Sequence, residues 1–484
     1  MTIFYLVFKN HNFMYKFEKL AQTLRHLIEQ GTWQPHQRLP SLREQSQQSG
    51  YSLMTVLNAY QELEAQGLIY SKDKSGYYVE QKIDHPVLEP QIEMSFMPDI
   101  QMNSLVFDYL KATQVVDIIG LGSAFPHEDL VYQPKLIQIL AKHARRKQSY
   151  ISVDSMPPGH YPLQQIIARR YSLQGIATEP EDIVITSGCL DALNLSLQAT
   201  TQAGDYILIQ STIFYGAWQA AERWGLKVIT LPEHPEHGFD LELFEQCLQK
   251  FPIKVCWFML NSHNPIGFTV SNDIKEKIAA LLEKYDVYLI EDDVYQELFY
   301  GAQRPLSVKY FNQQRVLHCS SFSKTLGAGC RVGWVHSRLF SHKIQHLQLM
   351  STLAVSPLLQ HALAEFLTTH HYEKHLRQLR QQLERNKKQC YHYLLQHLPT
   401  TCTIYYFNSG YFLWVKLAKE IDSMALYRIL LQQRISISPN HLFSIEQQQS
   451  QSIRLNCSLP WNDTTQFALD QLIKTIKTLE KNEA

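Results

Sequence analysis

The sequence predicts a multidomain chain in which a small α+β unit precedes a large α/β domain and a smaller C-terminal α+β subdomain. Three observations support this prediction. In the first 80 residues, apolar side chains recur at helical spacing and then give way to two short strand patterns. From residue 118 onward, short apolar runs alternate with helical patterns, which is typical of βαβ units and a mainly parallel sheet. Beyond residue 370, a long charged helix is followed by mixed strands and helices.

Residues 15–80 carry three helical patterns and a hairpin. The first helix has apolar residues at helical spacing from Phe17 to Ile28 and ends at Gly31. Ser41 is a suitable N-cap for the second helix, and the third extends from about Ser52 to Gln66. Two strand patterns flank the polar turn at 72–76. Three helices followed by a hairpin predict a winged helix-turn-helix.

Composition sets few limits on function, because the 484 residues have a formal net charge of zero. We interpret residues 1–14 as an N-terminal extension and residues 81–115 as a proline-punctuated linker that ends in a helix at about 104–113. No early apolar run is long enough to cross a membrane, and none resembles a secretion signal. The eight scattered cysteines indicate free thiols and a cytoplasmic protein.

The large domain is expected at 116–370 and the subdomain at 371–484. Apolar runs predict strands at 182–186, 206–209, 228–231, 255–260 and 287–290, with further strands of the subdomain at 410–415 and 452–456. The residues suited to chemistry follow these strands, at predicted strand–loop junctions.

Lys324 is the most informative residue of the chain. It lies among hydroxyls and glycines, with Arg331 seven residues further on. Such an amine suits a Schiff base to pyridoxal phosphate (PLP). Ser321, Ser323 and Arg331 are then expected to bind the phosphate. A solvated loop position is the alternative for a lone lysine, but other parts that a PLP site needs occur in order along the chain.

Two segments after strands suit the phosphate and the ring of such a cofactor. Ser187, Gly188 and Cys189 precede a helix, whose N-terminus offers free N–H groups to a phosphate. An ordinary glycine turn is the alternative. Phe214 follows another strand and could stack on the pyridine ring, with Tyr215 as the alternative stacking residue and a core position as the structural alternative.

Polar residues after two further strands suit the rest of the cofactor. Asn264 could donate to the phenolate oxygen, although Asn-Pro is also turn chemistry. Asp292 could keep the pyridine nitrogen protonated, and Tyr295 could add a second bond to the phenolate. Adjacent carboxylates are also typical of metal ligands or a solvated loop, but neither explains Lys324; we predict no metal. Arg454, on a C-terminal strand, suits a substrate α-carboxylate, with a surface ion pair as the alternative.

This order of motifs resembles the fold-type I, class I/II aminotransferases over about residues 115–480. The most specific marks are Ser321 to Lys324 with Arg331, Asp292 to Tyr295, and Asn264 with Gly267. Residues 15–80 resemble the GntR winged helix through Leu39 to Ser41 with Arg43, and through Ser75 to Tyr77. Together they resemble the MocR-type subfamily of GntR transcriptional regulators, in which a winged helix is fused to an aminotransferase-like domain.

The resemblance implies a PLP-dependent regulator that binds double-stranded operator DNA and senses an amine or amino acid through an aldimine at Lys324. It implies a homodimer with domains swapped head to tail, and a catalytic role for Lys324, Asp292 and Tyr295. DNA contacts are expected from Ser41, Arg43, Ser52, Thr55, Asn58, Lys72 and Lys74. The chain departs from the usual pattern at Leu53, Leu57, Ala328 and Asp154, with Tyr150 as a displaced candidate for a tyrosine of the partner subunit.

Two alternatives remain open at this point. The chain could be a working aminotransferase that acts on an amino acid with a 2-oxo acid acceptor, because its site residues look complete. It could also be a DNA-binding scaffold with an inactive cofactor domain, although the intact Lys324 argues against this.

Overall fold

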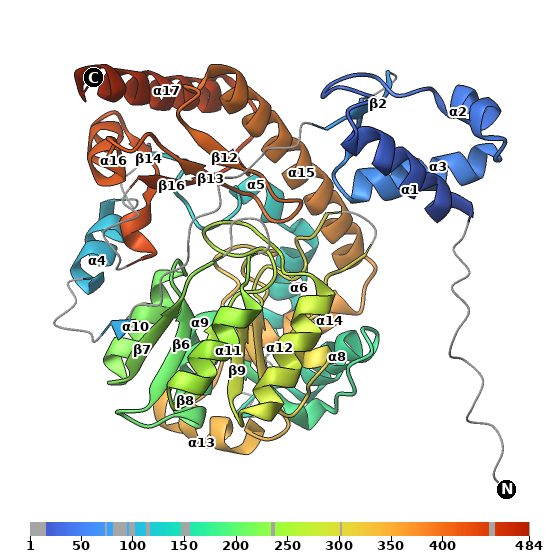
Figure 1. Ribbon diagram of the computed structural model, residues 1–484. Helices are drawn as coiled ribbons and strands as arrows, with labels where there is room; N and C mark the ends of the chain where they lie inside the picture. Colours follow the sequence, from blue (N-terminus) through green and yellow to red (C-terminus); the bar gives the residue numbers. More distant parts are fainter. Residues whose placement is uncertain are drawn as a thin grey trace, which may run out of the picture. The chain divides into compact units, whose positions relative to one another are not determined.

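The computed structural model describes residues 16–72, 75–80, 94–95, 102–112, 117–146, 155–233, 238–300, 303–444 and 451–483 (Figure 1). The chain forms two compact units, Met1–Pro86 and Val87–Ala484. The segments predicted as an N-terminal extension (1–14) and as the first part of a linker (81–93) lie outside the described residues, as do Lys74, Tyr150 and Asp154.

The smaller unit is the predicted winged helix-turn-helix. It comprises α1 (Lys16–Glu29), α2 (Leu42–Ser49), α3 (Leu53–Ala65) and an antiparallel hairpin of β1 (Ile69–Lys72) and β2 (Gly76–Val79). A capping box begins α2, because the Ser41 hydroxyl accepts from the Glu44 N–H and the Glu44 carboxylate accepts from the Ser41 N–H. The core joins α1 and α3 to the hairpin, with Leu42 of α2 packed against it, through Leu20, Leu24, Leu39, Val56, Tyr60, Leu63, Ile69 and Val79.

The larger unit is built on an eight-stranded sheet in the order β3-β7-β6-β8-β9-β10-β11-β5. The strands are β3 (Met94–Ser95), β5 (Ile183–Thr186), β6 (Tyr206–Gln210), β7 (Lys227–Leu231), β8 (Ile253–Phe258), β9 (Tyr288–Asp292), β10 (Val316–Ser321) and β11 (Gly333–His336). The strands from β7 to β10 pair in parallel, and β11 is antiparallel to both β10 and β5. Strand β5 therefore has the same direction as β10, as the mainly parallel prediction required.

Helices cover both faces of this sheet, which is why its central strands are continuous apolar runs. On one face, Leu208 packs with residues of α11 (Leu241–Lys250) and α12 (Asn272–Lys284), which Figure 1 shows in front of the strands. On the other face, Ile207 and Ile209 pack with residues of α9 (Cys189–Thr200) and α10 (Tyr215–Arg223). Further helices of this unit are α6 (Pro134–Ala144), α8 (Tyr161–Ser172), α13 (Ser341–Ser351) and α14 (Pro357–Leu367).

The C-terminal part contains a four-stranded antiparallel sheet between long helices. Its sheet has the order β12-β13-β16-β15, with β12 (Thr403–Tyr405), β13 (Phe412–Lys416), β15 (Ser438–Pro439) and β16 (Ser452–Asn456). The helices are α15 (His371–His397), α16 (Ser423–Gln432) and α17 (Asp463–Glu483). A short parallel pair of β4 (Ile119–Gly120) and β14 (Ile435–Ser436) joins the start of the large domain to this part.

The predicted linker at 81–115 needs correction, because its second half belongs to the folded domain. Strand β3 extends the sheet by pairing with β7, and the expected helix is α4 (Met102–Ala112). The buried Tyr109 hydroxyl on α4 donates to the Gly122 carbonyl at 3.0 Å and lies 2.8 Å from the Ser438 hydroxyl. A two-residue strand has no periodicity that could have revealed it. Within the described ranges, no helix is long and apolar enough to cross a membrane.

We predict that Leu63→Ala destabilises the winged-helix unit by about 2–5 kcal/mol, because Leu63 is fully buried in its core. Leu53→Ala is the matched control, since Leu53 on the same helix is 49% exposed and its loss should cost less than about 0.5 kcal/mol. Hydrogen exchange of peptides from residues 16–79, measured in the full chain at increasing urea concentration, gives the change in the free energy of unfolding for both substitutions. Equal effects of the two substitutions would contradict the packing described above.

Candidate functional site

The predicted site residues collect at one edge of the eight-stranded sheet, where parallel strands end. Ser187 to Cys189 follow β5, Phe214 follows β6 and Asn264 follows β8. Asp292 is the last residue of β9, and Lys324 follows β10. Since these strands run in the same direction, their carboxyl ends meet, which is where open α/β sheets bind ligands.

Lys324 is buried at this edge, with 7% of its surface exposed. Its Nζ donates to the Ala124 carbonyl at 2.7 Å and lies 3.9 Å from the centroid of the Phe125 ring. Burial lowers the pKa of Lys324 to about 7, and Arg454 lowers it further, while Asp292 opposes the shift. A large fraction of this amine is therefore neutral, and hence nucleophilic, near neutral pH.

Asp292 lies close to Lys324 and is also buried. The Cys189 thiol donates to its Oδ1 at 3.6 Å. Burial raises the pKa of Asp292 to about 7, although the bond from Cys189 and the charge of Lys324 act in the opposite direction. Tyr295 is buried beside the lysine, with its ring centroid 5.4 Å from Nζ, and burial raises its pKa. Burial thus favours the neutral form of the Asp292 carboxyl, and a cationic partner bound to it would favour the ionised form.

Arg454 lies on β16 and is 2% exposed. Its Nη1 donates to the Asn264 Oδ1 at 2.6 Å, and its Nη2 donates to the Gly122 carbonyl at 2.7 Å and to the Ser438 hydroxyl at 3.0 Å. Its Nε has no hydrogen-bond partner among the described residues. No carboxylate of the described residues forms an ion pair with the Arg454 guanidinium. A buried cation therefore remains for a ligand anion to neutralise.

A second group of donors surrounds Gly188 at the beginning of α9. Nη2 of Arg331 donates to the Ser187 carbonyl at 3.1 Å, and the Ser321 and Ser323 hydroxyls lie 2.7 Å apart. Gly188 has φ +93°, and a Cβ there would lie 2.8 Å from Nη2 of Arg331. The Ser187 N–H is bound to Asp191 and the Gly188 N–H to the Thr186 carbonyl, so the hydroxyls, the guanidinium and the N–H groups of α9 from Cys189 onward remain for an anion.

Phe214 and Tyr215 lie side by side at the beginning of α10, with ring centroids 4.5 Å apart. Both are half-buried. Tyr215 is close enough to Tyr295 and Arg454 to interact with them electrostatically, and burial raises its pKa. The structure brings both stacking candidates to the site and does not separate them.

The three adjacent carboxylates do not form a metal site. Glu291 accepts from the Ser307 hydroxyl and the Val308 N–H, whereas Asp293 lies 3.0 Å from His318. Asp292 faces Cys189 instead. Across the described residues, no cluster of three histidine, cysteine or acidic side chains could hold a metal ion.

Several residues of this site were not found from the sequence. Ala124 and Phe125 contact Lys324, Gly122 and Ser438 contact Arg454, and the Tyr411 hydroxyl donates to the Ala124 carbonyl at 2.8 Å. The glycines at 120 and 122, followed by Phe125-Pro126, are the signal that could have identified this segment.

In the winged helix, most predicted DNA-contacting residues are at the surface. Arg43 on α2, Asn58 on α3 and Lys72 at the end of β1 are exposed. Ser41 and Ser52 are the N-caps of α2 and α3, and the Thr55 hydroxyl is 2.9 Å from that of Ser52. Leu53 and Met54 are exposed in the first turn of α3, where they present an apolar surface rather than an arginine.

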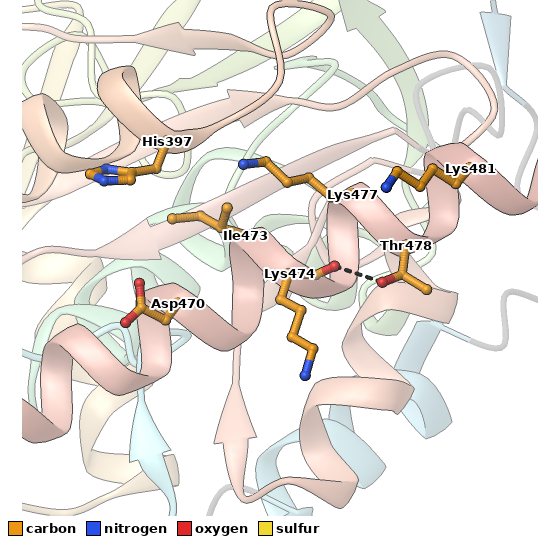
Figure 2. Close-up of a pocket in the computed structure, with 7 residues that line it drawn as sticks. All are labelled: His397, Asp470, Ile473, Lys474, Lys477, Thr478 and Lys481. Carbon is orange, nitrogen blue, oxygen red and sulfur yellow. Dashed lines mark hydrogen bonds between the residues drawn. The ribbon is translucent and has the colours of Figure 1, made fainter.

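Figure 2 shows a different hollow, of about 400 Å³, along α17. It is lined by His397, Asp470, Ile473, Lys474, Lys477, Thr478 and Lys481. Its three lysines are exposed, and none of the predicted site residues lines it. The buried charges at the sheet edge make that edge the stronger candidate site.

Both parts of the chain match known families. Residues 117–471 match the family of class I and II aminotransferases, and residues 16–79 match the gntR family of bacterial regulatory proteins. The chain is 43% identical to the uncharacterized HTH-type transcriptional regulator YdcR of Escherichia coli (strain K12), over 96% of this chain and 99% of that protein. It is 32% identical to YjiR, an uncharacterized HTH-type transcriptional regulator of the same organism, over 95% of this chain and 98% of that protein.

Among solved structures, the multiple substrate aminotransferase of Thermococcus profundus is similar with a TM-score of 0.72 and 21% identity, covering 79% of this chain and all of that one. This likeness concerns the fold of the larger unit. The full-length matches and the two family assignments agree with the winged helix and the sheet described above. The chain therefore belongs to the gntR family of bacterial regulatory proteins, in the MocR-type subfamily whose winged helix is followed by a class I and II aminotransferase domain.

Proposed function

We propose that this protein is a PLP-dependent transcriptional regulator that binds operator DNA and senses an amine or amino acid at Lys324. The observation that carries the proposal is the buried Lys324, with a pKa near 7, beside the buried cation of Arg454. A solved relative, the α-aminoadipate aminotransferase LysN of Thermus thermophilus, is 22% identical with a TM-score of 0.72 over 79% of this chain and 96% of that one. It was determined with N-(5'-phosphopyridoxyl)-L-leucine, which supports PLP as the cofactor.

The residues at the sheet edge fit this cofactor. Ser321, Ser323, Arg331, the Ser187 hydroxyl and the Cys189 N–H at the beginning of α9 would hold the phosphate, and Gly188 would leave room for it. Asp292 would bind the pyridine nitrogen, Asn264 and Tyr295 the phenolate oxygen, and Phe214 the face of the ring. Bound PLP supplies an aldehyde that captures amines and a ring that accepts electrons. Arg454 would bind the α-carboxylate of an amino acid through its planar fork.

The same residues could support transamination between an amino acid and a 2-oxo acid. We do not favour this as the main role, because the two full-length relatives carry the names of transcriptional regulators. In a regulator, a ligand amine that replaced Lys324 on the cofactor's aldehyde carbon and released the lysine amine would shift the protein between DNA-binding states.

We further propose that the protein acts as a homodimer, with domains swapped between subunits as in its subfamily. Residues 1–80 contain 8 Lys+Arg against 7 Asp+Glu, which is a net charge of only +1. Phosphate contacts supply most of the affinity for DNA, so one such unit is expected to bind weakly. Two units on adjacent half-sites would raise the affinity.

The rate at which cofactor-free protein captures PLP should rise with pH around pH 7. Only the neutral amine attacks an aldehyde, and the neutral fraction of Lys324 should increase from about a tenth at pH 6 to about nine-tenths at pH 8. Growth of the visible absorbance after mixing measures this rate, with Nα-acetyl-lysine as the reference for the titration of PLP itself.

Lys324→Ala should abolish this absorbance, whereas Lys419→Ala, at an exposed position, should leave it unchanged. A rate that is constant between pH 6 and 8, or absorbance that survives in Lys324→Ala, would contradict the assignment of Lys324.

Arg454→Gln should weaken capture of an L-amino acid by about 10- to 150-fold, because a hydrogen bond to a charged group is worth about 1.5–3 kcal/mol. Capture of the amine formed by decarboxylation of the same amino acid should weaken by less than about threefold, since this amine has no carboxylate for Arg454 to bind. Titration of the visible spectrum with both compounds tests the role of Arg454. An equal loss for both would show that Arg454 has only a structural role.

Footprinting upstream of the neighbouring genes should reveal a protected operator whose protection changes when PLP and an effective amine are both added. Arg43→Ala should weaken this protection, because Arg43 is exposed at the beginning of α2. Arg25→Ala is the control, since Arg25 is an exposed arginine that pairs with Glu29 on α1. The absence of protection under every condition would rule out the regulator.

A further inference from the structure

Helix α15 holds the residue next to Lys324 through two side chains. His375 Nε2 lies 2.6 Å from the Thr325 carbonyl oxygen, and the Tyr372 hydroxyl lies 3.2 Å from the Thr325 hydroxyl. His375, Tyr372 and Thr325 are all buried, with exposed fractions of 5%, 2% and 2%. The backbone beside the predicted cofactor lysine is therefore attached to the first turns of α15.

The second ring nitrogen of His375 continues this connection outward. A carbonyl oxygen can only accept, so Nε2 carries the hydrogen that Thr325 receives. Burial lowers the pKa of His375, so the ring is neutral and Nδ1 accepts. Nδ1 accepts from Gln133 Nε2 at 2.9 Å, and Gln133 is the N-cap of α6. This neutral histidine therefore bridges Thr325 and Gln133.

The bridge forms part of the wall of a surface hollow of about 490 Å³. Helix α15 forms one side of the hollow, and helix α5 (Glu128–Val131) with Gln133 forms the other. Each side contacts the turn after Lys324. On the α5 side, Val131 Cγ2 lies 3.4 Å from where a Cβ on Gly327 would be. On the α15 side the contact is His375 itself.

Helix α15 also reaches the strand that carries Arg454. Its Asn386 amide donates to the Ser458 and Leu459 carbonyls at 3.1 and 3.0 Å, directly after β16. Between these ends, Leu379 and Leu383 pack in the core of the sheet. One helix thus connects the segment that carries the amine with the strand that carries the predicted carboxylate-binding arginine.

We propose that His375 is a positioning residue that couples Lys324 to the hollow between α5 and α15, so that a change at Lys324 alters this part of the surface. The inference rests on the proposed function, because it requires a cofactor on Lys324. A ligand sensor needs such a connection, since an effector can act at a distance only through an element that has different contacts in the two states. Thr325, His375 and Gln133 supply a continuous path of hydrogen bonds from the site to the surface.

The test compares His375→Leu with His375→Gln in the full chain. Leucine removes both bonds, whereas glutamine can still donate to Thr325 and accept from Gln133, so it is the conservative variant. Each protein is loaded with PLP and then treated with aminooxyacetate. This reagent exchanges the carbon–nitrogen double bond to Lys324 for one to itself and releases the lysine amine without oxidation or reduction.

The readout is hydrogen exchange of peptides 128–135 and 371–385 before and after this release. In the wild type and in His375→Gln, exchange should change by at least about threefold, and in His375→Leu by less than about 1.5-fold. A response of His375→Leu equal to that of the wild type would overturn the inference. Absence of PLP absorbance in the wild type would instead overturn the proposed function, so the two failures are distinguishable.

Gln133→Leu keeps the test informative if His375→Leu fails to fold. This substitution removes only the hydrogen bond between Gln133 and His375, because His375 can still donate to the Thr325 carbonyl. It should therefore reduce the response of peptide 128–135, which then depends on the contact of Val131 with Gly327 alone, while leaving that of peptide 371–385. Responses of both peptides at the level of the wild type would contradict the path through His375.

Discussion

The shared direction of β5, β6, β8, β9 and β10 is the constraint on which the candidate site depends. Each strand ends at the same edge of the sheet, and the segment that follows it lies there. The site residues between positions 187 and 324 therefore come together, although they are far apart in the sequence. The strands are buried on both faces, and the core fixes their register. The site therefore rests on the buried core of the larger unit.

Burial then determines the chemistry of the charges at that edge. Lys324, Arg454 and Asp292 have little contact with water, and the low dielectric favours the neutral forms of the lysine and the carboxyl. Arg454 and the exposed Arg331 add two guanidinium groups. The site thus combines a nucleophilic amine with two fixed cations, which matches an aldehyde cofactor with a phosphate and a ligand with a carboxylate.

A sensor also has to report its ligand beyond the site. Long helix α15 contacts the Thr325 backbone near one end and the segment after β16 further along, so one helix contacts the segments next to both predicted ligand-binding groups. An aminotransferase needs the same two groups but does not need a connection to the surface. The proposed bridge from His375 to Gln133 would supply such a connection.

The sequence by itself determined the winged helix, the alternating α/β pattern and the order of the site residues after strand ends, because periodicity and short motifs are local properties. Only the tertiary structure decided the pairs that join distant segments: Lys324 with Ala124, Arg454 with Asn264, and His375 with Gln133. It also placed β3 and α4 in the folded domain rather than in a linker. Contacts between residues about two hundred positions apart leave no periodic pattern, so they emerge only when the packed sheet brings the segments together.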